Sequence, residues 1–116
     1  MQPHTSSIGW NALIRARKQQ QEELIVEACA YALRLRRDFP QARVFVYGSV
    51  ARGDFNLHSD IDLLVVADLP ERPLEQSEVL YRYVRGREEP KGLRVEAFGK
   101  LMAAGKLEYL KEAREL

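Results

Sequence analysis

Two short groups of residues, separated by ten positions, carry the side chains best suited to chemistry. Gly48-Ser49 follows a short apolar stretch, and Asp60-Ile61-Asp62 opens a longer one. Side chains alternate along a strand, so Asp60 and Asp62 are expected to project from one face while Ile61 points to the other. Two neighbouring carboxylates repel each other unless a cation lies between them. Their hard oxygen atoms suit Mg²⁺ or Mn²⁺, so the spacing predicts a metal-binding pair.

The residues that follow Gly48 favour a phosphate-binding turn. Gly48 has no side chain, so a ligand can approach the backbone closely at this position. The segment from Val50 to Arg52 is long enough for one helical turn before Gly53. Such a turn aims backbone N–H groups, together with the Ser49 hydroxyl, at an anion. A phosphate-binding turn beside a metal-binding pair is what phosphoryl or nucleotidyl transfer requires.

A third carboxylate is expected near the pair, and Glu96 is the candidate. It lies in the apolar segment Leu93–Phe98, which we predict to be a strand. By alternation Glu96 shares a face with Arg94 and Phe98. We expect Glu96 to be a third metal ligand or a general base. The alternative is a surface position paired with an arginine.

The elements that must position these residues follow from the apolar pattern. Apolar residues spaced by three and four predict long helices, and short β-branched runs predict strands. The sequence predicts a helix over 10–38, strands over 43–47, 61–67 and 93–98, and helices over 74–84 and 100–116, the last interrupted near Gly105. Residues 48–59 and 86–92 are expected to be connectors, the second a charged turn. The order α-β-β-α-β-α predicts an α/β (α+β) fold, a small mixed sheet packed against helices that cover one face.

Length and composition indicate one domain. The chain has 116 residues, of which 46% are hydrophobic, as in ordinary globular domains. We expect residues 10–116 to form a single domain after a flexible segment over 1–9. Cys29 is the single cysteine, and the longest apolar run, Leu63–Ala67, is too short to cross a bilayer. A cytoplasmic protein without membrane contact is therefore expected, and the net charge of +1 disfavours direct nucleic-acid binding.

The spacing of Gly48, Ser49, Asp60 and Asp62 resembles the active-site pattern of the DNA polymerase β-like nucleotidyltransferase superfamily. The short chain is similar to the minimal nucleotidyltransferase (MNT) branch of that superfamily. The resemblance covers roughly residues 44–96 and the helix before them. It implies a nucleotidyltransferase fold, in which Gly48 and Ser49 bind the nucleotide triphosphate and the two aspartates bind the catalytic metals.

The same resemblance implies roles for two further residues. Glu96 would be the third acid, at a place where the superfamily more often has Asp, so the chain departs from the commonest pattern there. The additional methylene of Glu changes the geometry of the ligand. Arg52 lies in the phosphate-binding turn, where it either contacts the nucleotide phosphates or has a structural role.

The activity implied by the resemblance is metal-dependent transfer of AMP from ATP, with Mg²⁺ or Mn²⁺ as cofactor, to a hydroxyl group. Many minimal nucleotidyltransferases are encoded beside a small helical HEPN protein, and the pair is described as a toxin–antitoxin system. The nucleotidyltransferase is thought to be the antitoxin, silencing the HEPN toxin by adding AMP to a tyrosine (AMPylation). The alternatives are an antibiotic-type enzyme with a small-molecule acceptor, and a non-catalytic antitoxin that only binds its partner. A homo-oligomer is also considered.

Overall fold

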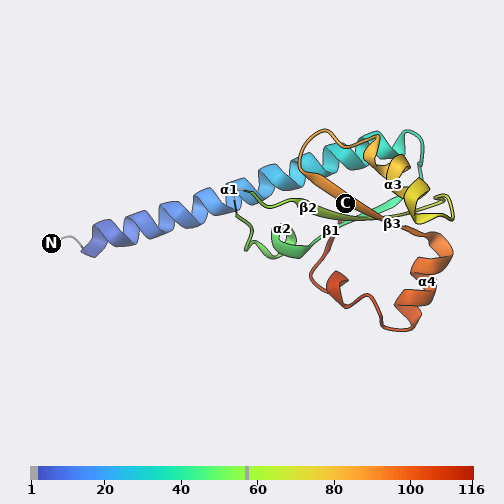
Figure 1. Cartoon of the computed structure of the whole chain (residues 1–116). Coiled ribbons are helices and arrows are strands. Elements are labelled where there is room, and N and C mark those ends of the chain that lie inside the picture. The colour runs from blue at the N-terminus through green and yellow to red at the C-terminus, as the bar shows by residue number, and fades with distance from the viewer. Residues whose placement is uncertain (1–2, 57) are drawn as a thin grey trace.

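The structure is a computed structural model that describes residues 3–56 and 58–116. Figure 1 shows the elements in chain order. They are α1 (Pro3–Arg36), β1 (Arg43–Tyr47), α2 (Gly48–Arg52), β2 (Ile61–Ala67), α3 (Pro73–Tyr81), β3 (Glu88–Arg94), α4 (Val95–Ala103), the 3₁₀ helix η1 (Glu108–Leu110) and β4 (Arg114–Glu115).

The strands form one mixed sheet in the order β3-β2-β1-β4. β1 is antiparallel to β2 and to β4, whereas β2 and β3 are parallel. The parallel pair needs a crossover, and α3 supplies it. The predicted α+β fold, with a small mixed sheet packed against helices, is confirmed.

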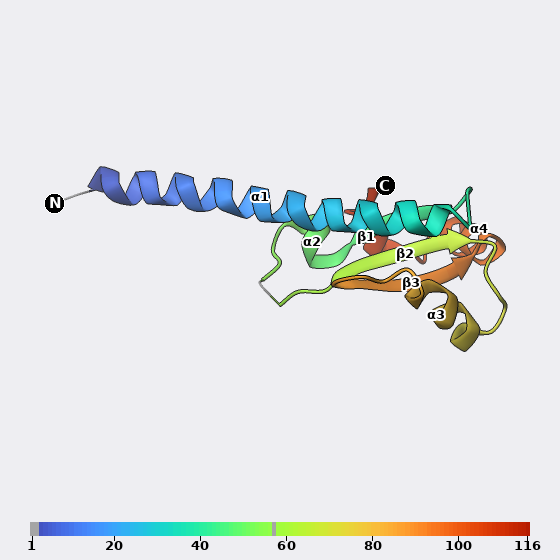
Figure 2. The same cartoon turned by 90° about the horizontal axis from the view of Figure 1, so that it is seen from above.

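Helix α1 packs on one face of the sheet and continues beyond it (Figure 2). Leu24, Ala28, Tyr31 and Leu35 are spaced by three and four residues and are buried, as the apolar stripe predicts. The helix begins at Pro3, seven residues before the expected start at residue 10, so most of the segment predicted to be flexible is helical. Residues 1 and 2 of that segment lie outside the described residues.

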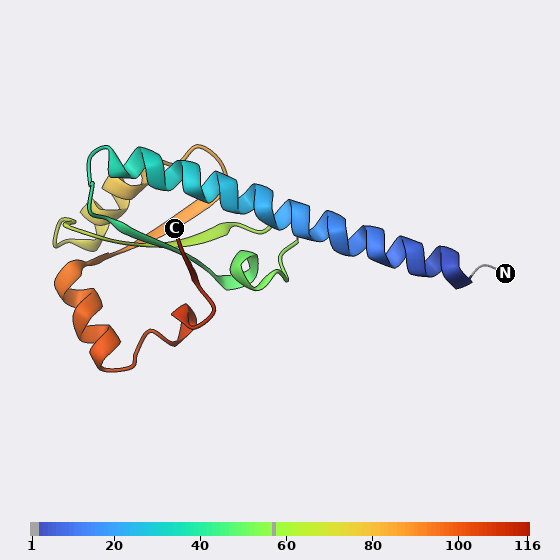
Figure 3. The ribbon, with the colours of Figure 1, turned by 180° about the vertical axis from the view of Figure 1, so that it is seen from behind.

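Both faces of the sheet are covered, which corrects the prediction that helices cover one face. On the α1 side the strand residues Val44, Val46, Leu63 and Val65 are buried. On the opposite side Phe45, Leu64 and Val66 of the sheet pack against Phe98 of α4 and against Leu107. Figure 3 shows α4 and the C-terminal segment on the face of the sheet away from α1. Alternate residues of β1 and β2 therefore enter two separate cores.

The third strand begins five residues earlier than predicted, because segment 86–92 is not a charged turn. Residues Glu88–Arg94 form β3, and Val95 begins α4. The charged residues, Pro90 and Gly92 made this segment resemble a turn in the sequence. Because β3 lies at an edge of the sheet, it tolerates a proline that an inner strand would exclude.

The C-terminal helix predicted over 100–116, with an interruption near Gly105, is correct up to Ala103 and wrong after Gly105. After α4 ends at Ala103, the chain forms η1 and then β4, which pairs with β1. Gly105 adopts a positive φ of 67° just after α4, which fits the end of a helix. Over the residues that the structure describes, no helix has the length and hydropathy needed to span a membrane.

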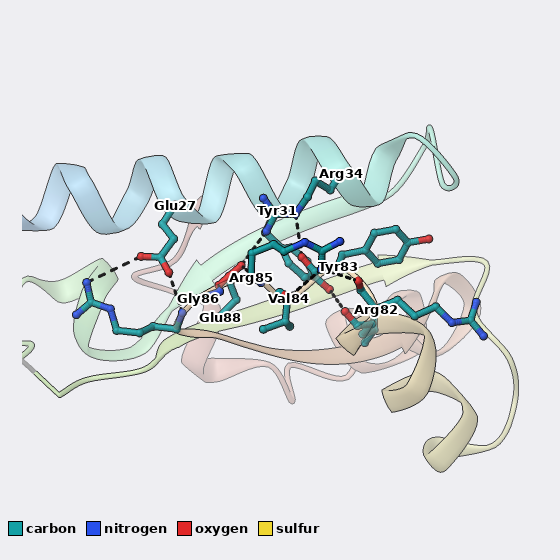
Figure 4. Close-up of polar contacts among 11 residues, drawn as sticks. Glu27, Tyr31, Arg34, Arg82, Tyr83, Val84, Arg85, Gly86 and Glu88 are labelled. Carbon is teal, nitrogen blue, oxygen red and sulfur yellow. Dashed lines mark hydrogen bonds and ion pairs between the residues drawn. The ribbon is translucent and has the colours of Figure 1, made fainter.

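A buried ion pair joins α1 to the start of β3 (Figure 4). The Glu88 side chain is fully buried, and its carboxylate accepts a hydrogen bond of 2.9 Å from Arg34 of α1. The same carboxylate accepts backbone N–H bonds from Arg85 (3.1 Å) and Gly86 (2.7 Å). The Tyr31 hydroxyl donates to the Leu80 carbonyl (2.9 Å). These bonds fix the connection between α3 and β3, and so fix the position of β3 beside β2.

Candidate active site

Three neighbouring strands bring polar side chains together at one end of the sheet. Asp62 of β2 is paired with Tyr47 of β1 on one side and with Glu89 of β3 on the other. Residues directly opposite each other project from the same face of a sheet. Tyr47 packs against the core on the α4 side, so all three side chains lie on that face.

Asp60, the residue directly before β2, belongs to the same group. A side-chain hydrogen bond with Asp60 raises the pKa of the Glu89 carboxyl, and the negative charges of Asp60 and Asp62 raise it further. Burial raises the pKa of Asp62, and the charge of Asp60 acts in the same direction, whereas Lys91 and Arg52 oppose the rise. We call Asp60, Asp62 and Glu89 the acidic set. Within the set, the charged form of Glu89 is destabilised by Asp60 and Asp62, and that of Asp62 by Asp60, which is the electrostatic condition that a bound cation relieves.

The donor chemistry of the acidic set fits Mg²⁺ or Mn²⁺, since carboxylate oxygens are the ligands that these hard cations prefer. The set is not preassembled, however. Within residues 3–56 and 58–116, no three His, Cys, Asp or Glu side chains are already placed to hold one metal ion together. The three carboxylates are close enough to interact electrostatically, and their side-chain torsions must adjust for all of them to ligate one ion.

Glu96 lies away from this group, which corrects its predicted place on a strand beside Asp60 and Asp62. It is exposed in the first turn of α4. The strand before α4 ends with Arg94 opposite Ala67, five residues along β2 from Asp62. Five residues of strand span roughly 16 Å. The prediction failed because the apolar residues around Glu96 suit a short strand and a helix equally well.

Glu89 takes the place in the fold that was expected for a third acid, and the sequence analysis missed it. Its strand was interpreted as a charged turn, so its face could not be assigned. The sequence carried little signal for this strand, because Glu88 and Glu89 are both charged. The alternation of β3 is visible only in the structure, where Glu88 and Pro90 are buried and Glu89 and Lys91 are not.

The turn after β1 is in contact with the acidic set. Gly48 has a φ of +71°, in the left-handed region, and a Cβ added there would overlap the Asp62 carboxylate. The helical turn expected before Gly53 is present as α2, and the N–H of Gly53 donates to the Ser49 carbonyl (2.8 Å). Gly48 and Ser49 therefore lie at the end of the sheet that carries the carboxylates. Their nucleotide-binding role stays a prediction.

Helix α1 holds this turn from the opposite side. The Gln21 amide donates to the Val50 carbonyl at the C-terminal side of α2 (2.8 Å). The Arg17 guanidinium donates to the Phe55 carbonyl and lies over the Phe55 ring, 4.2 Å from its centroid. The turn that approaches Asp62 is thus braced by a long helix rather than by the loop alone.

Arg52 is exposed on α2 and forms an ion pair with Asp54 (3.2 Å). Its positive charge also acts on Asp62, where it opposes the rise in pKa. Both interpretations from the sequence, a phosphate contact and a structural pair, therefore remain predictions.

A cavity of about 390 Å³ lies between the start of α2 and the C-terminal segment. The volume is within the range of about 300–1,000 Å³ that small-molecule sites occupy. Residues of the β1–α2 turn line one side and residues of segment 108–112 line the other; they are Tyr47, Gly48, Arg52, Glu108, Tyr109, Lys111 and Glu112. The sequence analysis did not single out the C-terminal members of this lining.

Comparison with known proteins agrees with the geometry. Residues 28–112 match the family model of the nucleotidyltransferase domain, and this match includes β1 to β3 and the acidic set. The chain therefore belongs to the nucleotidyltransferase domain family. The family supports a transferase that uses a nucleotide substrate, and its domains generally act with a divalent metal.

The fold is similar to a crystal structure from Sulfolobus solfataricus, of a protein assigned as a nucleotidyltransferase. The two sequences are 22% identical, the match covers 85% of this chain and 84% of that chain, and the TM-score is 0.65. No curated protein matches the sequence significantly. The resemblance found in the sequence is thus confirmed for the nucleotidyltransferase domain, whereas the MNT branch stays a prediction.

Proposed function

We propose that the protein is a metal-dependent nucleotidyltransferase that moves AMP from ATP to a hydroxyl group. The observation that carries this proposal is the meeting of the acidic set with the Gly48 turn. Asp62 and Glu89 on two strands and Asp60 just before β2 lie beside the Gly48 turn. A Cβ at position 48 would displace the Asp62 carboxylate. An uncompensated acidic group beside a tight, glycine-containing turn is suited to hold a cation together with a polyphosphate.

Each group of residues in the site has its own proposed role. Gly48 and Ser49 hold the triphosphate, and the acidic set holds Mg²⁺ or Mn²⁺. A divalent cation held there would offset the triphosphate charge. The acceptor oxygen would form a bond to the α-phosphorus as the bond from the α-phosphorus to the bridging β-phosphate oxygen breaks, so that pyrophosphate leaves and the hydroxyl proton passes to solvent. Arg52 and Lys91 place two further positive charges around the site, since both act on Asp62. The core on the opposite face of the sheet, which includes Ile61 and Leu63, anchors the strand that carries Asp62.

The acceptor that we propose is a tyrosine hydroxyl of a HEPN-family protein partner, which makes the chain the antitoxin of a toxin–antitoxin pair. The support for this step is the resemblance to the MNT branch. Transfer to a small molecule of the antibiotic type, and neutralisation of the partner by binding alone, are the competing outcomes of the test.

The test is intact mass spectrometry of the proposed HEPN-family partner, incubated with Mg²⁺, ATP and the purified protein. Wild type, Asp62→Asn and Glu96→Gln are compared, the last as a matched removal of a carboxylate outside the site. A mass gain of one or more AMP groups with wild type and Glu96→Gln, but not with Asp62→Asn, supports the proposal. No gain despite a stable complex would favour the binding-only antitoxin. No gain and no complex would direct the search to small-molecule acceptors.

A further inference from the structure

The cavity beside the candidate active site has a second wall that the Gly48–Asp62 motif does not include. This wall is segment 108–112, which comprises η1 and the two residues after it. It belongs to the part of the chain where the expected helix is replaced by η1 and β4. Tyr109 is the aromatic residue of this wall, and it faces a cavity whose other side is the Gly48 turn.

Tyr109 is in contact with a second aromatic ring, that of Tyr47, which also lines the cavity. The ring centroids of Tyr47 and Tyr109 are 4.9 Å apart, with the planes inclined by 52°. Tyr47 is half-buried, and burial together with the charges of Asp62 and Glu89 raises its pKa to about 12. Tyr109 in contrast is 46% exposed. Tyr47 is therefore the more enclosed ring of the pair, and Tyr109 presents aromatic surface to the cavity.

The charges along the cavity indicate which end suits the phosphates. Arg52 is at the α2 end, where its charge reaches Asp62. At the other end Glu108 and Glu112 are negative, and Lys111 pairs with Glu108 (2.6 Å). The α2 end therefore attracts a polyphosphate, whereas the Tyr109 end repels one and offers an aromatic ring instead.

We propose that Tyr109, in contact with Tyr47, is the stacking platform for the base of the nucleotide. This inference rests on the proposed function and adds the position of the base to it. A flat aromatic surface stacks on any base, and the larger ring system of a purine gains more contact than a pyrimidine. The platform thus makes purine nucleoside triphosphates the preferred substrate class.

The experiment is isothermal titration of the protein in Mg²⁺ with three ligands, namely ATP, CTP and inorganic tripolyphosphate. Wild type is compared with Tyr109→Phe, which keeps the ring, and Tyr109→Leu, which keeps apolar contact with Tyr47 but removes the aromatic face. Tyr81→Leu is the matched control, because Tyr81 is also about half exposed (49%) but lies on α3. Thermal unfolding of each variant reports whether it is folded.

We expect Tyr109→Leu to weaken ATP binding by about tenfold, and tripolyphosphate binding not at all. The preference for ATP over CTP should shrink in the same variant, while Tyr109→Phe and Tyr81→Leu behave as wild type. Unchanged ATP affinity in Tyr109→Leu, or equal loss of ATP and tripolyphosphate, would overturn the stacking role and leave the proposed function intact. Absence of ATP binding in wild type would instead overturn the proposed function, and the stacking role with it.

Discussion

Two adjacent glutamates at the start of β3 face opposite sides of the sheet and show how the chain uses the same side chain in two ways. Glu88 points toward α1, where its carboxylate is buried and receives hydrogen bonds from Arg34 and from two backbone N–H groups. Glu89 points to the other face, where its neighbours Asp60 and Asp62 are negative and raise its pKa.

The difference between these regions is whether the protein supplies the opposite charge. Around Glu88 the donors come from α1 and from the preceding loop, so the buried charge is compensated within the fold. Around Glu89 the chain gathers like charges, which Lys91 and Arg52 offset only in part, because the pKa values of Glu89 and Asp62 are still raised. Such an arrangement costs stability by itself, and residues held at such a cost mark a candidate functional site. The comparison therefore separates a structural acid from an acid that serves a ligand.

The largest expected effect is that of Asp62→Asn on activity. Removal of this carboxylate should reduce nucleotidyl transfer by roughly a thousandfold, or about 4 kcal/mol, because it lies beside the Gly48 turn and within electrostatic range of the other acids. The metal-free variant should be as stable as wild type or more stable, since one of several repelling charges is gone. Transfer rates check the expected loss of activity, and urea unfolding in EDTA checks the expected stability. If Asp62→Asn were inactive only because it unfolds, the distinction between the Glu88 and Glu89 regions would be contradicted.

The next effect is on stability, at Glu88. Glu88→Gln should lower the free energy of unfolding by about 3 kcal/mol, because Arg34 is left in a largely buried site without its charged partner. The double variant Glu88→Leu with Arg34→Met should recover much of this loss, because it removes both charges together. Urea denaturation measures both. If Glu88→Gln left stability unchanged but abolished transfer, Glu88 would belong to the site rather than to the fold.

A smaller effect separates Glu89 from Glu96. We expect Glu89→Gln to slow transfer by about tenfold, because the acidic set keeps two carboxylates, and Glu96→Gln to leave the rate within about twofold of wild type. The two variants make the same chemical change at the two ends of the parallel β2–β3 pair. Steady-state rates at saturating Mg²⁺ suffice. If Glu96→Gln transferred more slowly than Glu89→Gln, Glu96 rather than Glu89 would be the third acid.

The smallest effect is on the pH dependence of stability. The pKa values of Asp62 and Glu89 are raised in the folded state, so the folded protein keeps protons that the unfolded chain releases. These groups therefore favour folding most below about pH 4, and this contribution is lost as pH rises through the ordinary carboxylate range into the raised range. Urea unfolding of the metal-free protein across this range should show Asp62→Asn gaining stability relative to wild type as pH rises. If the difference in the free energy of unfolding between the two proteins did not change with pH, this would argue against mutual repulsion in the acidic set.

The sequence predicted the local parts of the site and missed the part that depends on strand pairing. Gly48, Asp60 and Asp62 lie in one strand–turn–strand segment, so spacing and alternation were enough to place them together. Glu89 reaches them only because β3 pairs in parallel with β2 after the α3 crossover. That pairing joins residues far apart in the chain, through an edge strand whose charges and proline hide its pattern.

The errors at Glu96 and at the C-terminus have a related cause. A six-residue apolar segment such as 93–98 satisfies the period of a strand and of a helix, and only packing of Phe98 beneath the sheet decides between them. The same packing creates a second covered face, and with it the cavity wall at Tyr109. That wall depends on long-range contacts of β4 with β1, for which a two-residue strand carries almost no sequence signal.

The most direct test of the central claim is to count Mn²⁺ ions bound by the protein with electron paramagnetic resonance, with and without an ATP analogue that cannot be cleaved. Wild type, Asp62→Asn and Glu96→Gln are compared at equal concentration. If the acidic set is the metal–nucleotide site, the analogue increases the number of Mn²⁺ ions bound by wild type and by Glu96→Gln. The number bound by Asp62→Asn stays at its value without nucleotide. Equal nucleotide-dependent binding by Asp62→Asn and wild type would contradict the claim and place the nucleotide elsewhere on the molecule.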